Sequence, residues 1–206
     1  MKFNNTSVYN IYNAVLGARN PMNSWNRSDS VFKGYNGKIE NTVIGKNDLE
    51  LMQKLIKAGS EHRKFLRQIF ISVDITAPLY FYKELDTYKV GTVANSTSTM
   101  HKLASTPITI DCFENGEMIY SFTIAELEMN RLKYLETKDK NEWKKLIVNL
   151  PESWLQTRTV TMNYENVLNM IKHRSHHKLT EWSVDFINWA KTLPYADELL
   201  FLEKGE

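Results

Sequence analysis

The segment Ile69-Phe70-Ile71-Ser72-Val73-Asp74-Ile75 carries the clearest secondary-structure signal in the chain. Its isoleucine and valine side chains alternate with Phe70, Ser72 and Asp74, which places all the β-branched residues on one face of an extended segment. We therefore predict a β-strand with one buried face. Because proline cannot continue a hydrogen-bonded ladder, Ala77-Pro78 is expected to end this strand.

A hydroxyl-rich run follows the strand. The aromatic segment Leu79–Leu85 predicts a helix that leads into residues 86–101, where Asn95-Ser96-Thr97-Ser98-Thr99 are all short and polar and Lys89 and His101 supply cationic groups. Short hydroxyl side chains and the amides around them can donate hydrogen bonds to phosphate oxygens. The composition fits two interpretations equally, a site for a phosphate-bearing ligand such as a nucleotide or a polar surface loop.

The balance of charges limits the classes of partner. The 206 residues include 26 Lys and Arg against 24 Asp and Glu, which gives a net charge of +2. This balance argues against a basic face that binds nucleic acid, whereas a ligand with one or two phosphates needs only a local positive pocket. The length fits one compact domain with a substantial core.

Targeting and redox signals favour the cytoplasm. Residues 1–5 lack the apolar stretch of a signal peptide, and no run approaches membrane-spanning length. Cys112 is the single cysteine, so no internal disulfide can form, and we expect it to fill a small space in the core. These features predict a soluble cytoplasmic protein with no membrane partner.

The N-terminal third is expected to be helical with polar connections. The apolar spacing from Val8 to Leu16 predicts a first helix with Ser7 as its N-cap. The loop 18–29 contains arginines and a tryptophan, which fits either the lining of a site or a surface loop held by one aromatic ring. Residues 34–47 are predicted to form a connection, and a second helix is predicted from Asn47 or Asp48 to Ala58.

The rest of the chain is predicted to combine one hairpin with several helices. Asn115-Gly116 is a strong turn signal, so residues 107–122 are predicted to form a β-hairpin. Helices are then predicted over Glu126–Leu135, Lys140–Leu150, Pro151–Thr157 and Thr161–Arg174. A final apolar stripe is expected to be core and consists of Leu179, Trp182, Phe186, Trp189 and Leu193.

Basic and amide side chains gather in two further places. The segment 60–67 packs basic groups around Phe65, which fits either a solvated charge cluster or a contact with a flavin or phosphate. Asn163, Asn166 and Asn169 recur every three residues in a predicted helix. Because asparagine is a mediocre helix former, this repeat indicates hydrogen bonds to something outside the helix.

Arg174, at the end of the same predicted helix, has two interpretations. An arginine there could stabilise negative charge that develops on a pyrimidine, or it could form a salt bridge with Glu165 or Glu181. The histidines between 173 and 177 have a spacing that recurs by chance, so no metal site is predicted. Glycine-rich phosphate loops and a GxSxG element are missing from the sequence, which disfavours Rossmann, P-loop and serine hydrolase interpretations.

Taken together, these segments resemble flavin-dependent thymidylate synthase, in particular a divergent phage or prophage type. Leu51-Met52 through Gly59-Ser60-Glu61, followed by the strand, resembles the helix, GH-type loop and strand of that family. Residues 86–101 fall at its RHR-x7-S signature. Thr161-Met162-Asn163 to Asn169 and Arg174 resemble its T-V-N-x-R-x-L-x-N motif and the arginine five residues later. The region 107–140 matches least.

The resemblance implies a fold, an activity and an assembly. The fold would be α+β, with helices around a small central sheet, over residues 1–206 as one domain with a β-hairpin insertion at about 107–122. Members of the family use FAD to pass a reducing equivalent from NADPH, and they transfer a one-carbon unit from methylenetetrahydrofolate to C5 of dUMP. They are homotetramers whose sites are shared between subunits. In a phage-encoded member, the expected location is the host cytoplasm.

The resemblance also implies roles for individual residues. Arg174 matches the catalytic arginine that stabilises charge on the activated pyrimidine. The residues expected to bind the flavin are His62, Arg63, Thr87, Tyr88, Lys89, Asn163 and Asn169. The residues expected to bind the nucleotide are Glu84, Asp86, Asn95, Ser96, Thr97, Ser98 and Thr99.

The chain departs from the family at its central signature. Arg-His-Arg is replaced by Thr87-Tyr88-Lys89, although the seven-residue spacing from Lys89 to the hydroxyl of Thr97 survives. The Glu and Arg that flank this hydroxyl in the family are Asn95 and Thr99 here, which is not a conservative change at a phosphate site. Either Lys89, Arg63 and Arg67 substitute for the missing charge, or the ligand differs. Two further alternatives are a scaffold that binds nucleotide without catalysis and a changed reaction at C5 of the pyrimidine.

Overall fold

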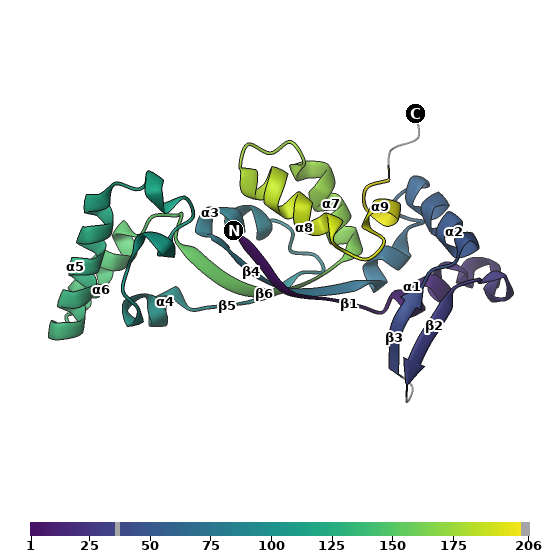
Figure 1. Ribbon diagram of the computed structural model, residues 1–206, viewed down its shortest axis with the longest axis horizontal. Helices are drawn as coiled ribbons and strands as arrows, with labels where there is room; N and C mark the ends of the chain where they lie inside the picture. Colours follow the sequence, from purple (N-terminus) through teal and green to yellow (C-terminus); the bar gives the residue numbers. More distant parts are fainter. Residues whose placement is uncertain (36–37, 203–206) are drawn as a thin grey trace. The chain divides into compact units, whose positions relative to one another are not determined.

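The computed structural model describes residues 1–35 and 38–202. Contacts between residues divide the chain into two compact units. We call residues 1–4, 74–89 and 94–159 unit 1, and residues 5–73, 90–93 and 160–206 unit 2. Figure 1 labels the helices and strands, which occur in both units.

Two sheets occur among the described residues. The larger sheet has the strand order β1-β4-β6-β5. Its strands are β1 (Lys2–Tyr9), β4 (Phe70–Pro78), β6 (Leu155–Asn163) and β5 (Val93–Ser96). The second sheet is an antiparallel pair in unit 2, β2 (Val31–Tyr35) with β3 (Lys38–Val43). The mixed helix and sheet content confirms the predicted α+β class.

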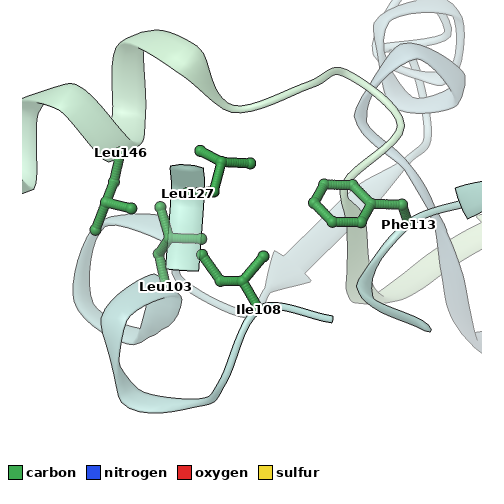
Figure 2. Close-up of a cluster of buried hydrophobic side chains, with 5 residues drawn as sticks. All are labelled: Leu103, Ile108, Phe113, Leu127 and Leu146. Atoms are coloured by element: carbon green, nitrogen blue, oxygen red, sulfur yellow. The ribbon is translucent and has the colours of Figure 1, made fainter. Parts of the chain in front are cut away.

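Unit 1 combines several helices with a small apolar core. The helices are α3 (Leu79–Leu85), α4 (Thr99–Lys102), α5 (Ser121–Thr137) and α6 (Lys140–Asn149). Figure 2 shows the core side chains, with Leu103, Ile108, Leu127 and Leu146 gathered together and the ring of Phe113 facing them. The helix pair α5 and α6 packs together and supplies Leu127 and Leu146 to this cluster (Figure 1).

In unit 2, the core is larger and more aromatic. The helices are α1 (Ile11–Ala18), α2 (Lys46–Lys57), α7 (Tyr164–Arg174), the π-helix Glu181–Phe186, α8 (Ile187–Lys191) and α9 (Ala196–Leu199). Trp182, Phe186 and Tyr164 are almost completely buried. The expected stripe from Leu179 to Leu193 is therefore core, although Leu179 itself is only half-buried. Burial raises the pKa of Tyr164, whose hydroxyl donates to the Pro194 carbonyl at 2.8 Å.

The strongest sequence signals are confirmed. Strand β4 buries Ile71, Val73 and Ile75 to 1% exposure or less and ends at Pro78, and Ile69 directly before the strand is also fully buried. The helices predicted around residues 48–58, 79–85, 126–135 and 140–150 correspond to α2, α3, α5 and α6. Apolar spacing indicates the buried face of α2, which includes Met52 and Ile56, whereas the buried residues of α5 include Asn130 and Arg131 beside Leu127.

The prediction of a helix starting after Ser7 is wrong. Residues Lys2–Tyr9 form strand β1, and the helix begins only at Ile11 after Asn10, whose φ is 70°. Pairing in the sheet overrides the helical spacing, and the Thr6 hydroxyl accepts a hydrogen bond from the Trp189 indole at 3.0 Å.

The predicted connection at 34–47 is also wrong. Strands β2 and β3 form an antiparallel ladder with partners such as Val31 and Val43, while residues 36 and 37 lie outside the described residues. The strand sequences are rich in Lys, Asn and Gly, so they show little apolar alternation. Tertiary contacts fix this end of the ladder, where the Tyr195 hydroxyl donates to the Thr42 carbonyl and accepts from the Ile44 amide.

The predicted hairpin at 107–122 is a third error. Asn115 makes the expected turn, with φ of 50°, but the flanking residues form the 3-10 helices Ile110–Cys112 and Gly116–Met118. A capping box between Thr109 and Cys112 favours this geometry over an extended strand. The segment therefore delivers Phe113 to the core of unit 1 instead of building a ladder.

The prediction of helix at 151–157 and 161–163 is wrong as well. The backbone of Pro151 accepts a hydrogen bond from Trp154, which makes a turn, and β6 then runs from Leu155 to Asn163. Residues 157–161 alternate threonine with arginine and valine, a composition that suits a strand. The helix expected from Thr161 begins instead at Tyr164 as α7.

Candidate functional site

In unit 1, a fixed arginine marks the strongest candidate for a ligand contact. Arg158 lies on β6, and its Nη1 atom donates to both carboxylate oxygens of Asp86, at 2.9 and 3.2 Å. Its Nε atom donates to Gln156 Oε1 at 2.9 Å. The guanidinium carbon lies 3.9 Å from the centre of the Tyr82 ring, within the range of a cation–π contact.

The support for this arginine is rigid. Tyr82 is buried on α3, and its hydroxyl approaches the carbonyls of Ile75 and Gln156 at 2.6 and 3.0 Å. Burial raises the pKa of Tyr82, so the ring stays neutral and keeps its hydroxyl proton. Since the Nη2 atom of Arg158 donates to none of the described residues, one edge of the fork remains for an anion.

The hydroxyl-rich run lies next to this arginine. Gln156, which accepts from Arg158, donates to the Thr97 carbonyl at 2.8 Å and reaches the Thr99 hydroxyl at 3.4 Å. Thr97 also exchanges hydrogen bonds with Thr157 of β6, at 2.9 and 3.3 Å. A chain of hydrogen bonds therefore connects Asp86, Arg158, Gln156, Thr97 and Thr99.

Other predicted residues of unit 1 have local roles or face solvent. Ser98 caps α4 by accepting from the His101 amide at 3.2 Å, and Asn95 and Ser96 are exposed on β5. The Thr87 hydroxyl donates to the Glu84 carbonyl at 2.7 Å, which continues the turn after α3. Tyr88 and Glu84 are half-buried, and Lys89 is exposed.

In unit 2, a buried ion pair ties the segment 60–67 to α7. Both Nε and Nη2 of Arg63 donate to the Glu165 carboxylate at 2.8 to 3.1 Å, and the two side chains are 10% and 9% exposed. The Nη2 atom of Arg63 also lies 3.5 Å from Asn169 Oδ1. Glu165 stands where the motif T-V-N-x-R-x-L-x-N has arginine, so the charge at this position is reversed.

The asparagine repeat has a structural explanation. Asn163 and Asn166 form a capping box at the start of α7. The Asn166 side chain also donates to the Val90 carbonyl at 2.7 Å. Gly91 has a φ of 79°, and a Cβ atom at this position would lie 2.9 Å from Nδ2 in the side chain of Asn163. Residues 90–93 therefore rest on the start of α7 only because position 91 is glycine.

A cavity in unit 2 lies beside the predicted flavin residue His62. Its volume is about 310 Å³. It is lined by Gly17, Ala18, Asn20, Pro21, Leu55, Glu61, His62, Lys64, Phe65 and Gln68. Apolar walls with His62, Lys64 and Gln68 among them suit the face of a heterocycle and hydrogen bonds to its edge. We call this the His62 cavity.

Arg174 ends α7 half-buried. Its guanidinium carbon lies 5.6 Å from the centre of the Trp182 ring. Of the two carboxylates considered as salt-bridge partners, Glu165 is bound by Arg63. A guanidinium at this distance from an aromatic ring is within the range of a cation–π contact.

The predicted site residues are thus divided between the units. Unit 1 holds Glu84, Asp86, Thr87, Tyr88, Lys89 and the run 95–99, and it brings together Asp86, Thr97 and Thr99. Unit 2 holds His62, Arg63, Asn163, Asn169 and Arg174, and it brings together Arg63 and Asn169. Across residues 1–35 and 38–202, no three His, Cys, Asp or Glu side chains are arranged to hold a metal ion.

Sequence reasoning missed Arg158 and Gln156. Both were hidden by the wrong prediction of a helix ending at residue 157 and a gap before residue 161. Their spacing of two residues in a threonine-rich segment is the signal that could have placed both on one face of a strand.

The fold is the α+β fold of the flavin-dependent thymidylate synthases. Two crystal structures of flavin-dependent thymidylate synthase ThyX from Helicobacter pylori with FAD and dUMP each match with a TM-score of 0.73 and 19% identity. These matches cover 98% of this chain and 98% and 97% of the ThyX chains. The UMP/dUMP methylase PolB from Streptomyces cacaoi, bound with 5-Br dUMP, matches with a TM-score of 0.61 and 14% identity, over 97% of this chain and 95% of PolB.

Sequence comparison adds nothing to the structural likeness. No family model matches the chain, and neither does any curated protein.

In the described part of the chain, none of the helices combines the length and the apolar character needed to cross a membrane.

Proposed function

We propose that the protein is an FAD-dependent enzyme of the thymidylate synthase type that reductively methylates dUMP, or a related pyrimidine nucleotide, at C5. Methylenetetrahydrofolate would supply the carbon and NADPH the reducing equivalent. The observation that carries the proposal is the match of fold over nearly the whole length of this chain and of proteins solved with FAD and dUMP.

The Arg158 cluster supports a nucleotide as the ligand. Arg158 is held in place by Tyr82, Gln156 and Asp86 and keeps one edge for an anion. We propose that this edge binds the nucleotide phosphate, with hydroxyls of the run 95–99 close to the phosphate and ribose. Such a preorganised fork costs little conformational entropy when the ligand binds.

The His62 cavity supports a flat heterocycle as the second ligand. Phe65, Leu55 and Pro21 supply apolar surface, and His62, Lys64 and Gln68 supply polar groups. These residue types fit the flavin ring system, which would provide hydride transfer when FAD is bound. We propose that Asn163 and Asn169 of the same unit take part in the flavin contacts, as the family resemblance implies. For Thr87-Tyr88-Lys89 of unit 1, the resemblance separately implies a flavin contact.

Arg174 would act on the base. Its fixed positive charge would stabilise negative charge on the pyrimidine ring, which lowers the barrier to reaction at C5. Arg63 differs from Arg174 in its role, because the Arg63 guanidinium already forms hydrogen bonds with the Glu165 carboxylate. We therefore propose that Arg63 positions α7 and leaves the direct contacts to other residues.

The test begins with flavin binding. Purified protein incubated with FAD and then desalted is expected to keep the visible absorbance of an oxidised flavin. With NADPH, methylenetetrahydrofolate and dUMP, mass spectrometry should detect the C5-methylated nucleotide, and parallel reactions with UMP define the sugar preference. A preparation that stays colourless after FAD is added would rule out the proposed function.

A homologue that binds nucleotide without methylating it is the second candidate. The reversed charge at Glu165 and the replacement of Arg-His-Arg by Thr87-Tyr88-Lys89 favour it. Calorimetry would then show dUMP binding, while the gene would fail to rescue a strain that requires thymidine. Rescue of growth would exclude this candidate.

A changed reaction or substrate is a third candidate, since one structural neighbour is described as a UMP/dUMP methylase. Product analysis with UMP and dUMP separates this third candidate from the first.

We also propose the homotetramer with shared sites that the resemblance implies. Light scattering after size exclusion gives the mass in solution, and a monomeric mass would contradict this assembly.

A further inference from the structure

A second cavity in unit 2 has no role in the proposed reaction. Its volume is about 280 Å³. It is lined by Arg19, Arg27, Asn47, Glu50, Leu51 and Lys54. We call it the Arg19 cavity. The segment 17–21 contributes to both cavities of this unit, with Arg19 here and its neighbours on either side at the His62 cavity.

The side chains that line the Arg19 cavity carry more positive than negative charge. Three cationic side chains line it against the single carboxylate of Glu50, and Lys46 lies 4.0 Å from that carboxylate. Arg27 and Lys54 form no ion pair with any residue in the described ranges 1–35 and 38–202. An excess of positive charge in a concave site attracts anions and raises their local concentration.

Arg19 gives this cavity a fixed cation. It is only 4% exposed, its Nε atom is bound to Asp48, and Nη1 lies 3.4 Å from the Ser24 carbonyl. Asp48 is held in turn by the hydroxyls of Ser28 and Ser30, at 2.6 and 2.5 Å. The guanidinium therefore cannot swing away from the cavity, unlike a lysine on the surface.

The positive character comes from side chains and not from a free helix end. The first amides of α2, at Asn47 and Asp48, already donate to the Asp29 carboxylate at 2.9 and 3.1 Å. The Asn47 side chain lines the cavity and can add an amide donor to the cations.

We propose that the Arg19 cavity binds a dianionic group, either a phosphate or a pair of carboxylates. Arg19 and Arg27 offer planar forks that suit such groups, and Lys54 adds a point charge. The inference does not depend on flavin or nucleotide chemistry, so it can succeed or fail independently of the proposed function.

The test uses the full chain labelled with ¹⁵N and titrated with inorganic phosphate at constant low ionic strength. Amide signals of residues 47–54 and of Arg19 and Arg27 are expected to shift in a saturable manner. A parallel titration with glutarate distinguishes paired carboxylates from phosphate. Both probes are small enough to enter a cavity of this size.

Substitutions locate the binding. Arg27→Gln and Lys54→Gln are each expected to weaken the tighter probe about fivefold, since each removes one charge at close range. Lys57→Gln is the matched control, because Lys57 is an exposed lysine on the same helix and does not line the cavity. All three residues have exposed side chains, so the variants should fold, which thermal unfolding checks.

The three variants distinguish binding in the Arg19 cavity from general electrostatic attraction. Weaker binding in Arg27→Gln and Lys54→Gln, with Lys57→Gln unchanged, supports the site. Equal weakening in all three variants would identify diffuse electrostatic attraction and overturn it. An absence of saturable shifts with either probe would also overturn it.

Discussion

Two arginine–carboxylate pairs, one in each unit, show how similar chemistry can serve different purposes. Arg63 and Glu165 are 10% and 9% exposed and share three hydrogen bonds. Arg158 and Asp86 are 18% and 57% exposed, and a single nitrogen of Arg158 contacts the carboxylate. The first pair is closed to solvent, whereas in the second pair the carboxylate faces water.

Solvation explains the consequence of this difference. A carboxylate that is largely solvated can give up its arginine to a stronger anion at little cost, because water replaces the lost contact. A buried carboxylate cannot, because its charge would remain without a partner in a medium of low polarity. The Arg63 pair therefore suits a role in stability, and the exposure of the Arg158 pair is consistent with the proposed contact to a ligand.

Breaking the buried pair is expected to have the largest effect. Glu165→Ala should lower the free energy of unfolding by about 3–5 kcal/mol, because the Arg63 charge is left buried and unpaired. Urea unfolding followed by tryptophan fluorescence measures this loss. The double variant Arg63→Met/Glu165→Leu should be more stable than Glu165→Ala, since it leaves no buried charge. Equal midpoints for Glu165→Ala and the unmodified protein would contradict the structural role.

The buried Arg19–Asp48 pair tests the same principle through pH. Burial alone would raise the pKa of Asp48, but hydrogen bonds from Ser28, Ser30 and Arg19 outweigh it and leave the pKa below its ordinary value. A carboxylate with a lowered folded-state pKa contributes its full stability above the unfolded value of about 4, and loses it as pH falls through the folded-state value.

The corresponding variant should remove this dependence. Asp48→Asn is expected to cost about 2–3 kcal/mol at neutral pH, because Arg19 loses its counter-charge in a buried site. The cost should shrink on acidification below about pH 4, because Asp48 takes up a proton in the unfolded chain at a higher pH than in the folded protein. Unfolding midpoints measured from pH 7 to pH 3 provide the check, and a cost that grows toward low pH would contradict the sign.

The elements that depend on local pattern were predictable from sequence. The alternation from Ile69 to Ile75 defines β4 because each side chain on the buried face is β-branched, and α2 follows its helical spacing. Strand β1 was missed because pairing with the distant strand β4, and not apolar alternation, holds it extended, whereas β2 and β3 pair with each other and were missed because their sequences show little apolar alternation. The partner of β1 is not visible in a local window of sequence.

Of the candidate site, the sequence predicted only the residues that belong to a segment of distinctive composition. Asp86, Thr97 and Thr99 belong to the hydroxyl-rich run, and the structure brings them together. The residue that connects them, Arg158, was missed because its strand was assigned to a helix and a gap. The reversed charge at Glu165 acquires its meaning only from Arg63, which lies 102 residues earlier in the chain.

Arg158 should separate binding from stability. Arg158→Ala is expected to weaken dUMP binding about 30-fold, since hydrogen bonds between charged groups contribute about 2 kcal/mol. The loss of folding stability should stay below about 1 kcal/mol because the pair with Asp86 is partly exposed. Calorimetry measures the affinity, and Lys144→Ala, an exposed lysine on α6, serves as the control.

The nucleoside sharpens this test. Deoxyuridine lacks the phosphate, so Arg158→Ala should leave its affinity unchanged. A comparable loss for nucleoside and nucleotide would place Arg158 at the base or the sugar, and not at the phosphate.

Substitution of Asp86, the exposed carboxylate of the second pair, is expected to have the smallest effect. We expect it to raise the affinity for dUMP, whereas the loss of a ligand contact would lower it. Asp86→Asn should change the free energy of unfolding by less than about 0.5 kcal/mol, because a solvated ion pair contributes little. If Asp86 only orients the guanidinium of Arg158 and does not contact the ligand, asparagine at this position should raise the affinity for dUMP a few-fold. The reason is that the substitution removes the repulsion between the Asp86 carboxylate and the phosphate. Calorimetry at low salt shows this gain best, and added salt should reduce it. A tenfold loss of affinity would mean instead that the Asp86 carboxylate binds the nucleotide itself, and the exposed pair would then be part of the recognition of the ligand.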